Sequence, residues 1–170
     1  MNGLINTKPD LGIDSRLDPG TIARVPGQHE RDVALSFQFK ADSSRVFYAL
    51  SIPEYIEAWL EAPDTDDLRF VFRQVAEETF RIDLYRGETL QAGVDGSCWV
   101  VGENQVRYIW KTTSPIAASE TVVDMKLLRG PGGCVLALKH SGLQDPDESA
   151  RCRRMWQQSL ERLGRLMEKN

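Results

Sequence analysis

The chain has 170 residues, of which 41% are hydrophobic and 27% charged, and its formal net charge at neutral pH is -4. These values are typical of one globular domain with a core of ordinary size. An acidic chain of this kind is not expected to bind nucleic acid or an anionic membrane surface, because both select basic proteins.

The cysteines and the N-terminus indicate a cellular compartment. Cys98, Cys134 and Cys152 lie far apart in the sequence, which predicts neither a disulfide framework nor a zinc site. We therefore expect reduced thiols in a cytoplasmic protein. No basic stretch followed by an apolar run opens the chain, so no signal peptide is predicted. No stretch approaches the roughly 18 apolar residues of a membrane helix, and we expect no membrane insertion.

Residues 1–30 carry three prolines and four glycines, and their apolar residues follow no period. This pattern predicts an extended or disordered N-terminal arm ahead of a single domain at residues 31–170. The alternative is a segment that docks on a partner or on its own domain.

The domain begins with a strand and two short helices. Apolar and polar residues alternate from Arg31 to Lys40, which predicts a strand with one buried face. Asp42 is placed to cap a short helix that ends near Leu50. Pro53 starts a second short helix, which ends before Pro63.

Six further strands follow in the alternation of apolar and polar residues, near residues 68–73, 80–85, 98–101, 106–113, 122–127 and 135–141. Turn residues separate them, most clearly the Gly-Pro-Gly-Gly sequence at residues 130–133. Strands spaced in this way predict an antiparallel meander, so the whole sheet has about seven strands.

A long helix is predicted at the C-terminal end. Asp145 is a candidate N-cap, Pro146 suits the first helical position, and Glu148 completes a capping box. Apolar residues then recur at helical spacing over about 22 residues, a length of roughly 33 Å. This helix is the only predicted element large enough to cover the apolar face of the sheet. The fold class is therefore α+β, with a curved sheet wrapped on the helix.

Three local motifs carry a family resemblance. The first strand leads into Asp-Ser-Ser-Arg-Val-Phe-Tyr-Ala-Leu at residues 42–50, the last strand closes with Lys-His-Ser-Gly-Leu at 139–143, and the helix contains Met-Trp-Gln-Gln-Ser-Leu-Glu-Arg-Leu at 155–163. With this element order, the chain resembles the START-like helix-grip superfamily (SRPBCC), and within it the branch named after the activator of the heat-shock chaperone ATPase. The resemblance implies a helix-grip fold over roughly residues 31–168.

The strand alternation and the helical stripe predict which side chains point between the sheet and the long helix. The resemblance implies that this space is a pocket for an apolar ligand, because members of the superfamily bind lipids, sterols, polyketides and hormones there. The alternative is a plain core. The predicted pocket residues are Phe37, Trp59, Phe80, Ile82, Tyr108, Trp110, Met125, Leu138, His140, Met155, Trp156 and Leu160. Two methionines suit an adaptable lining, and Tyr108, Trp110 and His140 are the polar groups able to orient a ligand.

Other chemistry has little support in the sequence. His140 ends a strand, so it points either into the cavity or toward backbone at the end of the sheet. Asp64, Asp66 and Asp67 form an acidic run typical of a solvated loop rather than of an acid–base pair. No phosphate-binding glycine loop, nucleophile elbow or set of metal ligands is present, so we expect no cofactor, no metal and no catalytic residue.

Three functions follow from these observations. The first is non-catalytic binding of a small hydrophobic molecule in a cavity between the sheet and the C-terminal helix. The second is a protein-interaction module, with a chaperone or another protein as partner, similar to the chaperone ATPase activators. The third is a polyketide cyclase-like enzyme. The sequence favours the first over an enzyme.

Overall fold

The computed structural model describes residues 31–62, 67–113 and 118–169. The predicted arm at residues 1–30, with His29, and the acidic residues Asp64 and Asp66 lie outside the described residues. The elements are, in chain order, β1 (Val33–Phe39), α1 (Ser43–Ser51), α2 (Pro53–Trp59), β2 (Leu68–Ala76), β3 (Thr79–Arg86), β4 (Thr89–Gly102), β5 (Gln105–Thr113), β6 (Ala118–Gly130), β7 (Gly133–Ser141) and α3 (Pro146–Glu168).

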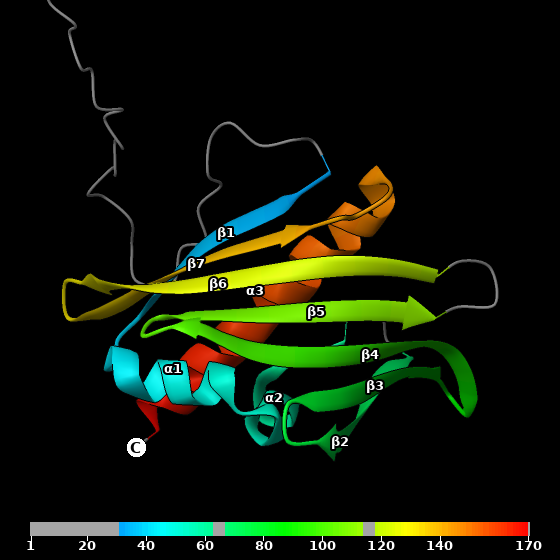
Figure 1. Ribbon diagram of the computed structural model, residues 1–170, viewed down its shortest axis with the longest axis horizontal. Helices are drawn as coiled ribbons and strands as arrows, with labels where there is room; N and C mark the ends of the chain where they lie inside the picture. Colours follow the sequence, from blue (N-terminus) through cyan, green and yellow to red (C-terminus); the bar gives the residue numbers. More distant parts are fainter. Residues whose placement is uncertain (1–30, 63–66, 114–117, 170) are drawn as a thin grey trace, which may run out of the picture.

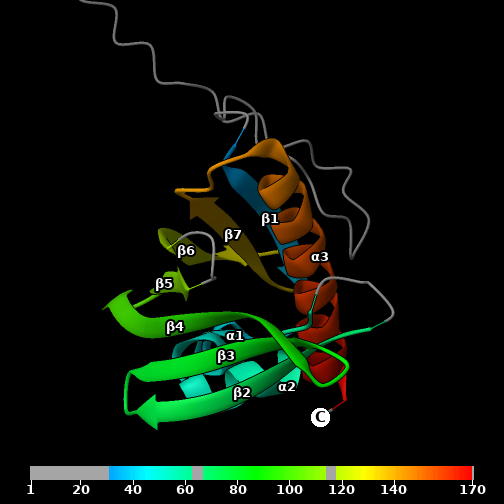
Figure 2. The same cartoon turned by 90° about the vertical axis from the view of Figure 1, so that its right-hand side faces the viewer.

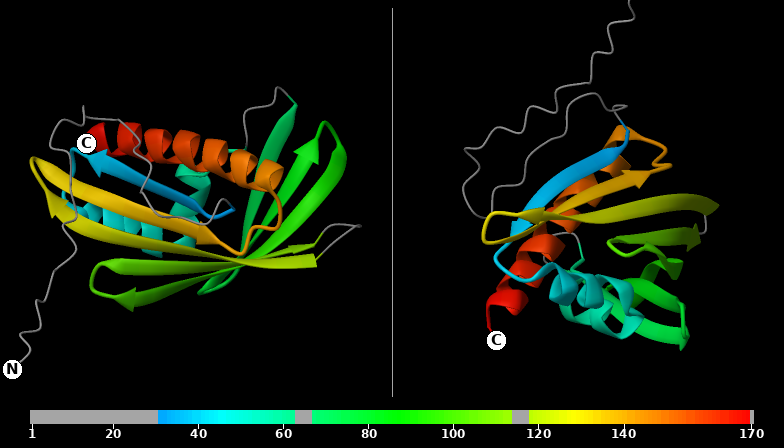
Figure 3. Two further views of the ribbon diagram at one scale, coloured as in Figure 1. Left: turned by 90° about the horizontal axis from the view of Figure 1, so that it is seen from above. Right: turned by 60° about the vertical axis from the view of Figure 1, so that its left-hand side comes forward.

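The seven strands form one antiparallel sheet in the order β1-β7-β6-β5-β4-β3-β2 (Figure 1). Strands β2 to β7 follow each other as a meander, and β1 closes the sheet by pairing with β7, so that Phe37 lies opposite Leu136. The sheet curves, and all three helices lie on its concave side (Figure 3). The predicted α+β helix-grip architecture is confirmed.

Helix α3 begins where the sequence predicts. The Asp145 carboxylate accepts a hydrogen bond from the Glu148 N–H at 2.7 Å, which satisfies one free donor of the first turn. The Glu148 carboxylate accepts from the Gln144 N–H at 2.7 Å, one residue before the position that a standard capping box uses. Together these bonds fix the angle at which the chain enters the helix.

Two serines tie α3 to the rest of the domain. Near its start, the Ser149 hydroxyl donates to the carbonyl oxygen of Arg31, just ahead of β1. Near its middle, the Ser159 hydroxyl accepts from the Glu61 N–H at 3.0 Å. Helix α3 packs against β1 of the sheet and against α2 (Figure 2). None of the described helices is long and apolar enough to cross a membrane.

Strand β4 is much longer than the sequence predicts, with 14 residues rather than a short run at residues 98–101. The difference has a steric reason, because glycines that normally mark turns lie here inside the strand. A Cβ atom on Gly96 would come within 2.2 Å of the Phe80 ring, and one on Gly93 within 2.2 Å of the Arg81 guanidinium. These glycines therefore make room for side chains of the neighbouring β3.

The convex face of β2, β3 and β4 carries an ion-pair network. Asp83, which is almost fully buried, accepts from Arg73 and Arg81, each at 2.8 Å. Arg81 also reaches Asp95 on β4 at 2.9 Å. The buried carboxylate is therefore paired on both of its oxygens, as a charge removed from water requires.

Candidate functional site

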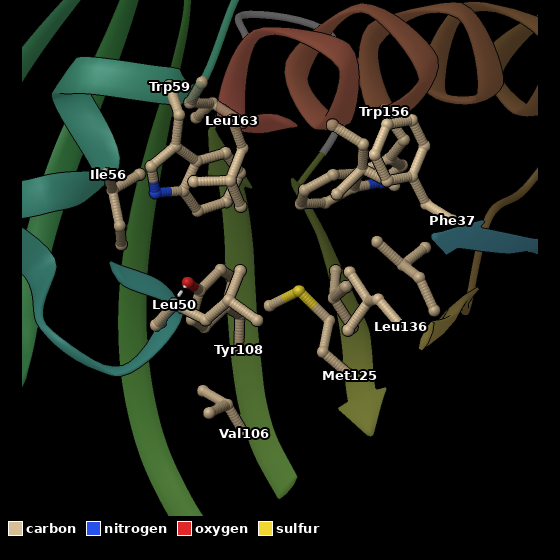
Figure 4. Packing of buried hydrophobic residues seen from close by; sticks show 14 of the residues in the cluster. Phe37, Leu50, Ile56, Trp59, Val106, Tyr108, Met125, Leu136, Trp156 and Leu163 are labelled. Carbon is tan, nitrogen blue, oxygen red and sulfur yellow. Dashed lines mark hydrogen bonds between the residues drawn. The ribbon is translucent and has the colours of Figure 1, made fainter. Parts of the chain in front are cut away.

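The centre of the space between the sheet and α3 is filled by aromatic side chains. The Trp156 indole stacks on Trp110 of β5, with ring centroids 5.3 Å apart and an interplanar angle of 24°. Trp59 of α2 lies on another side of Trp156 at 6.4 Å. Figure 4 shows Trp156 and Leu163 pointing from α3 toward Tyr108 and the strands. This part of the interior is a packed core.

His140 is held in the core by two side chains. Its Nδ1 accepts a hydrogen bond from Trp156 Nε1 at 3.1 Å, and its Nε2 lies 2.9 Å from the Thr121 hydroxyl. Since the indole nitrogen can only donate, Nδ1 carries no proton and the neutral ring holds its hydrogen on Nε2. Burial lowers the pKa of His140 to about 4. The ring is therefore neutral at physiological pH, and both of its nitrogens are occupied.

The other two predicted polar groups differ from each other. The Tyr108 hydroxyl donates to the carbonyl oxygen of Leu50 at the end of α1, and burial raises the pKa of this phenol well above its usual value. Trp110 Nε1 is buried and has no hydrogen-bond partner among the described residues. Three groups were predicted to orient a ligand. Among the described residues, the Trp110 indole N–H is the one of these groups that makes no hydrogen bond.

A cleft of about 650 Å³ opens next to this core, between α2, β2, β3 and the C-terminal half of α3. Phe70 and Phe72 of β2 and Ile82 of β3 present their apolar side chains to it from the sheet. Its apolar lining consists of Leu60, Ala62, Leu68, Phe70, Phe72 and Ile82, and its polar lining of Glu57, Glu61, Arg69, Gln158 and Arg162.

Two of the charged side chains at the cleft form an ion pair. Arg162 of α3 donates to the Glu61 carboxylate at 3.1 Å, and both side chains are partly exposed. The Arg69 guanidinium lies over the Tyr85 ring, 4.8 Å from its centroid. The combination is an apolar cleft with a polar border, which suits a ligand with an apolar body.

All twelve predicted pocket residues are buried, each less than 10% exposed. All except His140 belong to one hydrophobic cluster. Ile82 also lines the cleft. Phe37 is at the opposite end of the core, where it lines a smaller groove beside Gly164. Phe70 and Phe72 are not among the predicted pocket residues, although their alternation with arginines in β2 already marks them as inward-facing.

Nucleophilic chemistry has little support near the cleft. Burial raises the pKa values of Cys98 and Cys152 to about 12, so both are neutral thiols at physiological pH. In residues 31–62, 67–113 and 118–169, no three His, Cys, Asp or Glu side chains are close enough to hold a metal ion together. The carboxylates on the lining, Glu57 and Glu61, belong to α2 and the segment after it.

A curved antiparallel sheet that grips a long C-terminal helix, with two short helices after the first strand, defines the START-like helix-grip class. The family model for "Activator of Hsp90 ATPase homolog 1-like protein" (AHSA1) matches residues 40–168. The chain belongs to this family.

Solved structures share the fold at low sequence identity. A protein from Chromobacterium violaceum is 20% identical, with 82% of this chain and 99% of that chain covered and a TM-score of 0.65. The AHSA1 protein from Silicibacter pomeroyi is 21% identical, with 81% and 97% covered and a TM-score of 0.64. A protein of the dynemicin biosynthetic locus is 18% identical, with 82% and 48% covered and a TM-score of 0.58. No curated protein sequence matches the chain significantly.

Proposed function

We propose that the protein binds a small hydrophobic molecule, without covalent chemistry, in the cleft between α2, β2, β3 and α3. The observation that supports this most strongly is the cleft of about 650 Å³ with phenylalanine and aliphatic side chains on its sheet wall. Its size lies within the range of about 300–1,000 Å³ usual for small-molecule sites. The stacked indoles fill the centre of the core, so the cleft next to it is the space that remains for a ligand.

The lining indicates how a ligand lies in this cleft. Its apolar body packs against Phe70, Phe72 and Ile82, and its polar end faces Gln158 and Arg162 on α3. Such a division, with a mostly apolar surface and a few polar groups that set orientation, is usual in ligand pockets. A polyketide would also satisfy it, so turnover of a bound polyketide is the outcome that would favour the cyclase-like alternative.

The test is a binding screen with fatty acids, sterols and flavonoid-like aromatics, followed by thermal unfolding. A ligand at a hundredfold excess over its dissociation constant stabilises the native state by about 2.7 kcal/mol. We expect at least one compound class to raise the melting temperature and to appear bound in native mass spectrometry.

Ala62→Trp localises the binding. Ala62 is half-buried on the cleft lining, so a bulky side chain there fills the cleft with little disturbance of the core, and it should abolish the thermal shift. The matched control is Ala137→Trp on β7, which adds the same side chain to the convex face and should leave binding unchanged. If no compound binds, or if Ala62→Trp binds as well as the unaltered protein, the proposal fails.

A further inference from the structure

Strand β4 continues beyond its neighbour β3. The first paired residue of β3 is Thr79, opposite Ser97, whereas β4 runs on to Gly102 and pairs there with β5 alone. The short stretch Cys98–Gly102, which we call the β4 edge, therefore has a partner strand on one side. On its other side there is one further backbone hydrogen bond, which the Cys98 N–H donates to the carbonyl of Glu78 at 2.8 Å. Glu78 is the residue just before β3.

The strand geometry fixes which backbone groups remain on that side. In an antiparallel pair, the N–H and C=O of alternate residues point to the same neighbour. Since the Cys98 N–H points toward β3, the N–H and C=O of Val100 point the same way. Neither group of Val100 has a hydrogen-bond partner among the described residues. A strand laid along this edge would satisfy both.

Three consecutive side chains of the β4 edge are apolar and open to solvent. Trp99, Val100 and Val101 are 48%, 60% and 50% exposed, and they are consecutive. Val100 lies opposite Val106, which is only 1% exposed, so the cover that α1 gives to Val106 and to Cys98 does not extend to Val100. A run of exposed apolar residues on an unpaired edge is the arrangement that β-strand addition uses.

The charges around the edge decide between possible partners. Exposed carboxylates stand at both of its ends: Glu77 and Glu78 in the β2–β3 turn, and Glu103 in the β4–β5 turn. The nearest cation across the ladder, Arg107, is already paired with Asp124 at 2.8 Å. A second copy of this edge in antiparallel pairing would bring Glu103 toward Glu78 of that copy, which is unfavourable.

We propose that the β4 edge binds an extended segment of another protein as an added strand, and that this segment has an apolar centre and basic flanks. The backbone of Val100 supplies the ladder bonds, Trp99 and Val101 contact the apolar centre, and the carboxylates at both ends attract the flanks. This site is separate from the cleft, so the two proposals can fail independently.

The test uses a fluorescein-labelled peptide with alternating valine and threonine at its centre and two lysines at each end, and measures anisotropy against the full chain. We expect saturable binding that weakens as salt is added, and that weakens at least about tenfold when glutamates replace the lysines. Trp99→Lys and Val100→Pro should each reduce affinity by about tenfold or more, since one removes the apolar contact and the other the edge N–H donor.

Leu90→Lys is the matched control. Leu90 is on the same strand, is 51% exposed, and pairs with β3 away from the β4 edge, so its substitution should leave peptide affinity within twofold. Cooperative unfolding of each variant checks that it is folded. The proposal is overturned if the lysine-flanked and glutamate-flanked peptides bind alike, or if neither binds. It is also overturned if sedimentation shows a dimer that Trp99→Lys dissociates, because the edge would then belong to a second copy.

Discussion

Acidification is expected to destabilise the protein through His140. The pKa of His140 is about 4 in the folded chain and 6.5 in the unfolded reference, so the unfolded chain binds the proton more readily between these values. The stabilisation is complete above pH 6.5 and is lost as the pH falls toward 4. A difference of this size corresponds to about 3 kcal/mol in total, of which about 2 kcal/mol is lost between pH 7.5 and pH 5.

The structure gives the cause in atomic terms. The rings that pack against His140 are those of Trp110 and Trp156, and the third contact is the Thr121 hydroxyl. None of these groups carries a charge that would offset an imidazolium. A proton on Nδ1 would also remove the acceptor of the Trp156 indole N–H, so that two donors would face each other.

Urea unfolding from pH 5 to pH 7.5 measures the effect. His140→Gln should remove most of the slope that the unaltered protein shows, whereas His29→Gln, at the only other histidine, should keep it. At each pH, the free energy of unfolding of the variant is subtracted from that of the unaltered protein. This difference cancels the contribution of the carboxylates that titrate in the same pH range. If the His140→Gln profile runs parallel to that of the unaltered protein, the reasoning about a buried neutral imidazole is refuted.

Three further predictions concern stability. Trp156→Ala should lower the free energy of unfolding by about 3–5 kcal/mol in urea titration, because Trp156 is fully buried and its removal leaves a large void. A loss below about 1 kcal/mol would contradict its place in the core. Gly96→Ala should cost about 1–3 kcal/mol, since the new Cβ collides with the buried Phe80 ring, while Gly102→Ala, with open space around it, should change little in the same assay. Deleting residues 1–30 should shift the melting temperature by only a few degrees, given their aperiodic sequence, and loss of cooperative unfolding would show that they belong to the fold.

The element order could be predicted because most elements carry strong local patterns. Alternation in β1, β5 and β7 assigns Phe37, Tyr108 and Leu138 to the concave face, and Asp145 marks the start of α3. Strand β4 could not be predicted in full, because Gly93 and Gly96 read as turn residues in a single sequence. These strand positions are glycines because the side chains of Phe80 and Arg81 occupy the space that a Cβ atom would need. This contact can be seen only when the pairing of β4 with β3 is known.

The candidate site was harder to predict than the fold. The alternation within each strand predicts which side chains point toward the concave face. Whether these side chains enclose a cavity depends on how they pack against side chains from elements that are distant in the sequence. Trp59, Trp110 and Trp156 come from α2, β5 and α3, and their mutual stacking fills the centre. The partners of His140 are likewise set by the register of β6 and β7 and by the placement of α3.

The two serine contacts of α3 bear on how the cleft can change its width. Ser149 holds the helix to the residue before β1, and Ser159 holds it to the segment after α2. The helix is thus fixed at two points about ten residues apart, roughly 15 Å along its axis, and can neither slide nor tilt without breaking a bond. Strand β2, at the end of the sheet, is joined to it by no comparable bond among the described residues. We therefore expect the cleft to widen by movement of the β2–β3 hairpin while α3 stays in place, and hydrogen exchange should be faster in β2 than in α3.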